Sequence, residues 1–158
     1  IQVPMIPVPM TFQTAIVLLL PALLGTKLAL SAIMAWFGMG MVGLPVFAMT
    51  AGSIMGPAYF LGASGGYLIG FAVAALAVGY LFQLFDKGRN IHVLFLCMLF
   101  GHVIILTFGV LWMAYGMPNL GLETAIATGL MPFFAGMVLK SMLSACLIKS
   151  FEKPSSSA

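Results

Sequence analysis

The sequence predicts an all-α, polytopic membrane helical bundle, and two observations lead to this fold class. Hydrophobic residues make up 63% of the 158 residues and charged residues only 6%, whereas a soluble domain carries about a quarter charged residues. The hydrophobic residues also gather in runs close to the length of about 20 residues that a helix needs to cross a bilayer. These observations exclude a soluble globular enzyme, and we expect residues 1–158 to form a single membrane domain.

Five membrane spans are expected, because Gly-rich, Pro-containing or polar stretches separate five apolar runs from one another. The expected spans are residues 11–25, 28–47, 66–85, 92–115 and 133–148. The first is short and contains Pro21, so we expect it to bend or to pack inside the bundle. Residues 122–131 are expected to form a short interfacial helix, which Pro132 separates from the last span.

The remaining segments are expected to lie outside the spans. Three prolines within residues 1–10 predict an extended segment, and five glycines or prolines within residues 48–65 predict a long irregular loop near the membrane surface. Residues 86–90 and 116–119 are expected to be tight turns. Residues 149–158 are expected to form a solvated cytoplasmic tail.

Basic residues predict how the chain is oriented in the membrane. With five spans, five of the six basic residues fall on one face, and the opposite loops carry only Glu123. Cytoplasmic loops are enriched in Lys and Arg, so the first face is expected to be cytoplasmic. An odd number of spans would then leave the N-terminus outside, which suggests that an earlier helix belongs to the protein. The five basic residues are Lys27, Lys87, Arg89, Lys149 and Lys153.

Two ionisable residues, Lys140 and His102, lie clearly inside predicted spans, and only Lys140 is charged at neutral pH. A charge in a membrane span is costly and by default indicates a functional site. No acidic residue lies in the spans to pair with Lys140, which favours an anionic ligand such as a carboxylate. The alternative is that its aliphatic stem carries the ammonium group to the interface.

Other polar or aromatic residues in the spans have a structural interpretation beside a functional one. His102 fits an interhelical hydrogen bond at least as well as a ligand contact. Gln13 and Thr14 fit either a capping role or a ligand contact, and Trp112 fits either packing or stacking on a ligand. Gly66, Gly70 and Ala74 form a small-residue stripe that predicts close helix packing.

Motifs for catalysis, metal binding or nucleic-acid binding are not found in the sequence. It contains no Ser–His–Asp set, no paired carboxylates, no His or Cys ligand spacing and no phosphate-binding Gly-rich turn. Cys97 and Cys146 lie in apolar stretches and are expected to be small buried hydrophobic residues. We therefore expect neither enzymatic activity nor a cofactor or metal, and no nucleic acid as a partner.

Five short runs, in this order, resemble the BioY family, the biotin-specific substrate-binding (S) components of energy-coupling-factor (ECF) transporters. Each run is weak alone, but together they span most of the chain from residue 7 to about residue 145. The runs are PVPMTFQT at 7–14, GLPVFA at 43–48, GGYLIGF at 65–71, GVLW at 109–112, and PFFAG at 132–136 followed by Lys140.

The resemblance implies a fold, a function and partners. The S-component fold has six helices with both ends cytoplasmic, which would place most of the first helix before residue 1. Such a protein takes up biotin from outside, in the inner (plasma) membrane of a prokaryote, and delivers it inward with an ECF transmembrane coupling protein and two ATPase subunits. Lys140 aligns with the binding lysine of the family. The expected ligand-binding residues are Lys140, Gln13, Ser64, Gly66, Tyr67, His102, Trp112 and Met137.

The sequence departs from the family pattern beside the binding lysine. Where the family has an Asp three residues before the Lys, this chain has Met137, and a thioether accepts hydrogen bonds poorly. Two alternatives therefore stay open: a solitary carrier of biotin or a related carboxylate that works without the ATPases, and a structural membrane subunit with a degenerate site.

Overall fold

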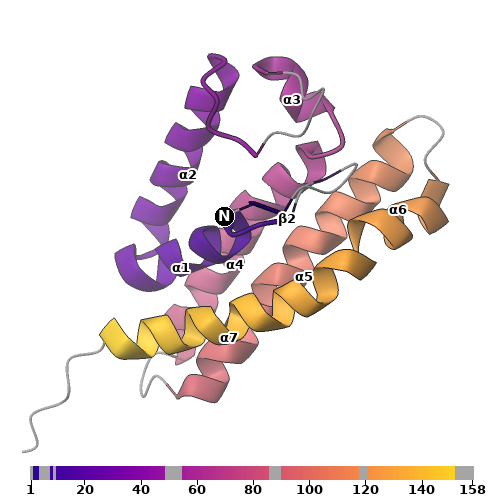
Figure 1. Ribbon diagram of the computed structural model, residues 1–158. Helices are drawn as coiled ribbons and strands as arrows, with labels where there is room; N and C mark the ends of the chain where they lie inside the picture. The colour runs from indigo at the N-terminus through magenta and orange to yellow at the C-terminus, as the bar shows by residue number, and fades with distance from the viewer. Residues whose placement is uncertain are drawn as a thin grey trace, which may run out of the picture.

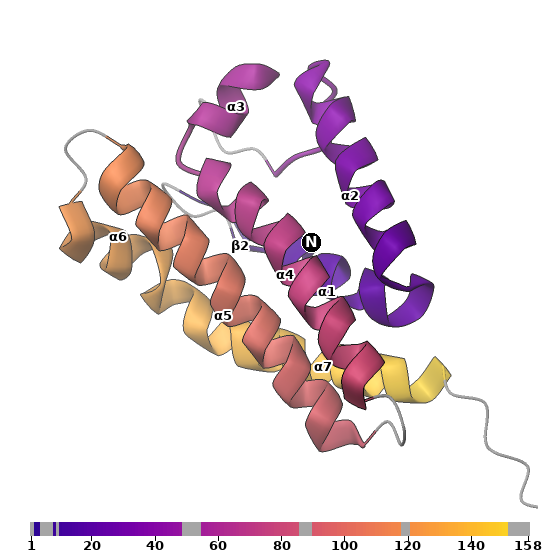
Figure 2. The same ribbon diagram turned by 180° about the vertical axis from the view of Figure 1, so that it is seen from behind.

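The structure is a computed structural model that describes residues 2–3, 8, 10–48, 55–85, 90–117 and 121–151. Two long helices, α4 and α5, pack against each other at the centre of the bundle; α1 and α7 lie on the same side of this pair and contact each other, and α2 packs against α1 and α4 (Figures 1 and 2). The helices are α1 (Gln13–Leu24), α2 (Thr26–Met41), α3 (Pro57–Leu61), α4 (Gly65–Phe85), α5 (Ile91–Gly116), α6 (Gly121–Gly129) and α7 (Phe134–Phe151), with a 3-10 turn η1 (Met131–Phe133) before α7.

Three helical segments of the described chain are long and apolar enough to cross a membrane: Gly65–Phe85, Ile91–Gly116 and Gly121–Phe151. Helices α1 and α2 have 12 and 16 residues, which at 1.5 Å per residue gives about 18 Å and 24 Å. Both are shorter than the hydrocarbon core of about 30 Å. The predicted helical bundle is confirmed, and only three of its five predicted spans have full membrane-crossing length.

Helix α2 ends earlier than predicted. It stops at Met41 rather than near residue 47, because Gly43 adopts a positive φ of 93° and Pro45 follows two residues later. Residues 46–48 continue outside the helix and return toward the bundle. We call Val46–Ala48 the strap, because side chains from three helices hold its carbonyl groups.

The N-terminal segment is extended where it is described, as predicted. Gln2 pairs with Thr11 and Val3 with Met10 in a two-residue antiparallel ladder, β1 (Gln2–Val3) with β2 (Met10–Thr11). The predicted irregular loop contains the short helix α3, which begins at Pro57, a residue suited to the first helical turn. The rest of that loop, residues 49–54, lies outside the described residues.

The last part of the chain follows the prediction closely. A short helix α6 precedes the long helix α7, and Pro132 lies in the 3-10 turn that separates them. Helix α7 continues to Phe151, three residues beyond the predicted end. Residues 86–89 and 118–119 of the expected turns and most of the expected tail, residues 152–158, lie outside the described residues, so the cytoplasmic tail stays a prediction.

Small residues bring α4 and α5 into close contact, as their spacing predicts. Added Cβ atoms at Gly66 would overlap Trp112, and at Gly70 they would lie 2.9 Å from the Cα of Ile105. Ala74 is fully buried. The two central helices therefore pack with their backbones nearly touching.

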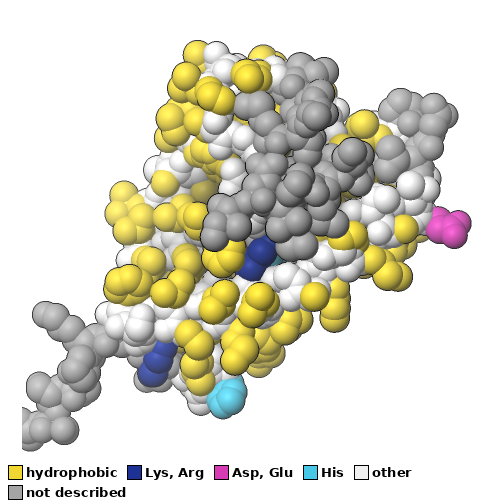
Figure 3. Space-filling model, in the orientation of Figure 1, with side chains coloured by type: hydrophobic (Ala, Val, Ile, Leu, Met, Phe, Trp, Pro, Cys, Tyr) yellow, Lys and Arg dark blue, Asp and Glu magenta, His cyan; other side chains and the backbone are white. Residues whose placement is uncertain are grey.

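Hydrophobic side chains are spread over much of the face shown in Figure 3, where an acidic side chain stands at one edge, a basic side chain stands toward the opposite edge and a second basic side chain lies near the middle. The α1–α2 junction and the C-terminal end of α7 lie at one end of the bundle, and α3 and α6 lie at the other (Figures 1 and 2). An apolar outer surface is typical of a protein that crosses a bilayer.

Candidate ligand-binding site

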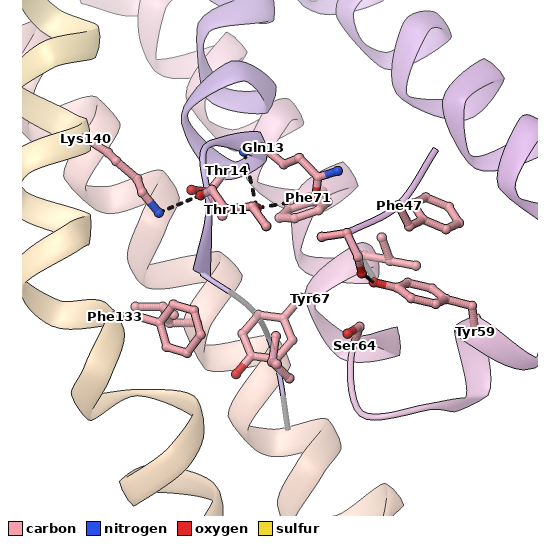
Figure 4. A pocket seen from close by; sticks show the side chains of 14 residues that line it. Thr11, Gln13, Thr14, Phe47, Tyr59, Ser64, Tyr67, Phe71, Phe133 and Lys140 are labelled. Atoms are coloured by element: carbon pink, nitrogen blue, oxygen red, sulfur yellow. Dashed lines mark hydrogen bonds between the residues drawn. The ribbon is translucent and has the colours of Figure 1, made fainter. Parts of the chain in front are cut away.

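A small cavity lies in the half of the bundle where α1, α4 and α7 begin. Its free volume is about 50 Å³, and Figure 4 shows side chains from several elements pointing into it. The walls combine aromatic and aliphatic side chains with a few polar groups, which is typical of small-molecule sites. The lining residues are Val8, Thr11, Gln13, Thr14, Phe47, Ala48, Tyr59, Ser64, Tyr67, Leu68, Phe71, Leu106, Phe133 and Lys140.

Lys140 brings a positive charge to the cavity from the second turn of α7. Its side chain is only 7% exposed, and its Nζ donates a hydrogen bond to the backbone carbonyl of Thr11 at 2.7 Å (Figure 4). No acidic side chain is among the lining residues that the structure describes. A buried charge without a counter-ion is costly, so this site favours a ligand that supplies negative charge.

Gln13 braces the first turn of α1 against the strap. Its Oε1 accepts a hydrogen bond from the Thr11 hydroxyl at 3.3 Å, and its Nε2 donates to the Val46 carbonyl at 3.5 Å. Trp36 of α2 donates to the same carbonyl at 3.1 Å. The carbonyl of Val46 thus holds two helices together at the edge of the cavity.

Aromatic rings form the wall beneath the strap. Phe47 stacks on Tyr59 of α3 with ring centroids 4.8 Å apart, and Trp36 stacks on Phe71 of α4 at 5.9 Å. The Tyr59 hydroxyl donates to the Ala48 carbonyl at 3.0 Å. Burial raises the pKa of Tyr59, so its phenol stays protonated and keeps this hydrogen bond. The strap is therefore fixed both by stacking and by donors.

Tyr67 and Ser64 complete the cavity at the start of α4. The ring of Tyr67 lies beside that of Phe133, with centroids 6.3 Å apart, and its hydroxyl donates to the carbonyl of Gly129 at 2.9 Å. The carbonyl of Ser64 accepts the first backbone hydrogen bond of the helix, from Leu68. Tyr67 thus presents its ring to the cavity and uses its hydroxyl to join α4 to α6.

Four of the eight expected ligand-binding residues come together in this cavity: Lys140, Gln13, Ser64 and Tyr67. The other four do not line it. Gly66 packs against Trp112, and the indole nitrogen of Trp112 donates to the Gly62 carbonyl at 3.0 Å. Met137 is buried in the hydrophobic core, one helical turn before Lys140.

His102 joins two helices, as its structural interpretation predicted. Its Nδ1 lies 2.9 Å from the Met98 carbonyl within α5 and 3.1 Å from the hydroxyl of Ser141 in α7. Its other ring nitrogen, Nε2, is buried without a partner in the described part of the chain. The histidine is not among the lining residues of the cavity.

Several lining residues were not singled out from the sequence. Thr11, Phe47, Phe71 and Phe133 all fall inside the runs that resemble the BioY family, so their membership of those runs was the available signal. Tyr59 lies in the Gly-rich loop, where it is the one residue with a polar aromatic side chain. A stacking partner across the chain could not be inferred from that position.

Comparison with known proteins identifies the family. A model of the BioY family matches residues 1–156 of the chain. The chain belongs to the BioY family. Two relatives illustrate the similarity: a probable biotin transporter BioY from Pyrococcus horikoshii is 33% identical over 135 residues, covering 85% of this chain and 75% of that protein. The biotin transporter BioY from Thermotoga maritima is 30% identical over 153 residues, covering 97% of this chain and 86% of that protein.

A solved structure shares the fold of this BioY-family chain. The crystal structure of the S-component for biotin from an ECF-type ABC transporter superposes with a TM-score of 0.80 and 26% sequence identity. The match covers 94% of this chain and 79% of that one. The expected S-component fold is thus confirmed, and the chain is a multi-pass membrane protein of a transporter family.

Proposed function

We propose that this BioY-family protein is the biotin-binding S component of an ECF transporter. It takes up biotin from outside in the inner (plasma) membrane of a prokaryote, and it acts as a transport component with no chemical step of its own. The cavity at the start of α1, α4 and α7 is the proposed binding site. The similarity to biotin transporters and to a biotin S component supports this proposal.

The buried ammonium group of Lys140 is the observation that carries the proposal. Biotin ends in a carboxylate at one end and in a ureido ring at the other, with an apolar thiophane ring between them. A cation with no acidic neighbour among the described lining residues matches the carboxylate. The Phe47, Tyr59 and Phe71 rings match the apolar part of the ligand.

For biotin to enter the cavity, the segments that close it, Thr11 and the strap, have to move. The free volume of about 50 Å³ is well below the roughly 300 Å³ or more of ordinary small-molecule sites. Thr11 and the strap lie against the cavity and are held by single hydrogen bonds from Lys140, Gln13, Trp36 and Tyr59. Exchanging the Lys140–Thr11 bond for a bond to the ligand would open the site and replace the lost interaction in one step.

Delivery into the cell is proposed to depend on an ECF module, a transmembrane coupling protein with two ATPase subunits. The S component would bind biotin alone and release it inward when docked on this module. A solitary carrier would instead transport biotin in cells that lack the module. Uptake of labelled biotin is expected only when the module is co-expressed, and uptake of equal rate without it would contradict the proposed partners.

Biotin binding by the purified protein tests the site directly. We expect Lys140→Met to weaken biotin binding by about 10–100-fold, because hydrogen bonds to charged groups contribute roughly 1.5–3 kcal/mol. Lys27→Met is the matched control, since Lys27 is exposed at the start of α2. Isothermal titration in detergent measures both. Absence of binding by the unmodified protein would overturn the proposed function, and equal affinity of Lys140→Met would overturn the proposed site.

A further inference from the structure

We propose that the hydroxyl of Thr14 is a specificity-determining ligand contact that acts together with Lys140. The two groups form a two-donor site for an oxygen acceptor of the ligand. This inference rests on the proposed function and deepens it. It starts from an observation on Thr14 itself: its Oγ1 is buried and has no hydrogen-bond partner among the described residues.

Three other hydroxyl groups in the helices of this protein are satisfied within their own helix. Thr107 donates to the carbonyl of Val103 at 2.8 Å, and Thr128 donates to that of Thr124 at 2.7 Å. Ser31 donates in the same way to Lys27 at 3.0 Å. In each case the acceptor is the backbone carbonyl four residues earlier.

Thr14 cannot use this local solution because of its place in the chain. It is the second residue of α1, so the residue four positions earlier is Met10, which belongs to the strand β2. A helical carbonyl at that position does not exist. Within the described part of the chain the hydroxyl is left without a partner, and an unsatisfied buried polar group lowers stability.

The residue that carries the unsatisfied hydroxyl lines the same cavity as the buried cation. Thr14 and Lys140 both line it, and Lys140 reaches the backbone of Thr11, three residues before Thr14. Figure 4 shows the Lys140 side chain extending toward the start of α1, where Thr11 and Thr14 lie. An ammonium group has three N–H donors and a threonine hydroxyl has one, so this corner of the cavity is rich in donors.

A donor-rich corner selects a ligand oxygen that accepts hydrogen bonds. Biotin has two such groups, the carboxylate of its side chain and the carbonyl of its ureido ring. Both accept from a hydroxyl and from an ammonium group at the same time. Thr14 and Lys140 together therefore discriminate against analogues whose oxygen acceptor is replaced at the end that reaches this corner.

Replacement of Thr14 by valine tests the contact, because valine keeps the shape and removes the hydroxyl. We expect Thr14→Val to weaken biotin binding by about tenfold, and Thr14→Ser, which keeps the hydroxyl, to stay within about threefold of the unmodified protein. Thr107→Val is the matched control and should bind biotin unchanged. The melting temperature of ligand-free Thr14→Val should equal or exceed that of the unmodified protein, since an unsatisfied polar group is removed.

Two analogues identify the ligand oxygen. If the penalty of Thr14→Val disappears for the analogue in which a methyl group, which accepts no hydrogen bond, replaces the carboxylate of biotin, the contact is to the carboxylate. If it disappears for 2-iminobiotin, in which an imine replaces the ureido carbonyl, the contact is to the ureido group. A penalty that persists in full for both analogues overturns the assigned acceptor.

The outcomes separate this inference from the proposed function. If the unmodified protein binds biotin, Lys140→Met weakens binding and Thr14→Val does not, this inference alone is wrong. If Thr14→Val and Thr14→Ser both weaken binding and both lower the melting temperature, Thr14 has a packing role and the inference is again wrong. If the unmodified protein does not bind biotin, both the proposed function and this inference are wrong.

Discussion

Tyr67 shows how one side chain can serve the fold and the site at once. Its ring lines the cavity, while its hydroxyl donates to the Gly129 carbonyl at the end of α6, 62 positions away in the chain. The hydroxyl also lies 3.6 Å from the sulfur of Met113. The polar part of this residue is therefore committed to protein contacts, and its apolar part faces the space for a ligand.

Tyr67→Phe separates these two roles. The substitution leaves the Gly129 carbonyl without its donor, so we expect the free energy of unfolding to fall by about 1–2 kcal/mol. Biotin affinity should change by less than about threefold, because the ring remains. Thermal unfolding and titration in detergent measure the two quantities, with Tyr80→Phe as the control at an exposed position. A large loss of affinity with unchanged stability would instead place the hydroxyl in the ligand site.

Single residues differ in how far the sequence alone could place them. The role of Lys140 as a candidate binding residue was predictable, because it is the one charged residue within an otherwise apolar predicted span. Met137 lies on the same helix as Lys140, and His102 lies on the neighbouring helix α5, but neither lines the cavity. Which face of a helix lines a cavity depends on how that helix is rotated about its axis relative to its neighbours. The spacing of residues in the sequence does not predict this rotation.

At the level of elements, helix existence was predictable and some helix ends were not. The ends of α4 and α5 lie within one residue of the predicted spans, since polar or Gly-rich stretches border them. The end of α2 differs by six residues, because the apolar composition continues through the strap. Apolar residues serve equally well in a membrane helix and in a segment buried against aromatic rings, so composition could not locate this end.

The close packing of α4 on α5 can be tested with a matched pair of glycines. Gly70→Ala places a Cβ atom 2.9 Å from the Cα of Ile105, which forces the two backbones apart and should lower the stability by about 1–3 kcal/mol. Gly38→Ala adds the same atom to α2 where nothing lies within 4 Å. There the better helix propensity of alanine should raise the stability by up to about 1 kcal/mol. Thermal unfolding of both variants checks this, and shifts of the same sign would contradict the packing argument.

At the scale of the whole molecule, the position of the cavity and the orientation of the chain in the membrane together indicate from which side a ligand enters. The cavity is lined from the first residues of α1, α4 and α7 and from the later part of α5. It therefore lies toward the end of the bundle opposite the α1–α2 junction, where Lys27 stands. If basic residues mark the cytoplasmic side, the ligand arrives from outside, as uptake requires.

The orientation can be tested with single cysteines at the two ends of the bundle. In a background with Cys97 and Cys146 replaced by alanine, Glu123→Cys puts a thiol at the exposed start of α6, and Lys27→Cys puts one at the exposed start of α2. A membrane-impermeant maleimide applied to intact cells should label Glu123→Cys, whereas Lys27→Cys should be labelled only after the membrane is opened. The asymmetry follows because the reagent cannot cross the bilayer and the two positions lie on opposite sides of it. Labelling of Lys27→Cys but not of Glu123→Cys in intact cells would indicate that the cavity lies toward the cytoplasm, and it would contradict uptake from outside.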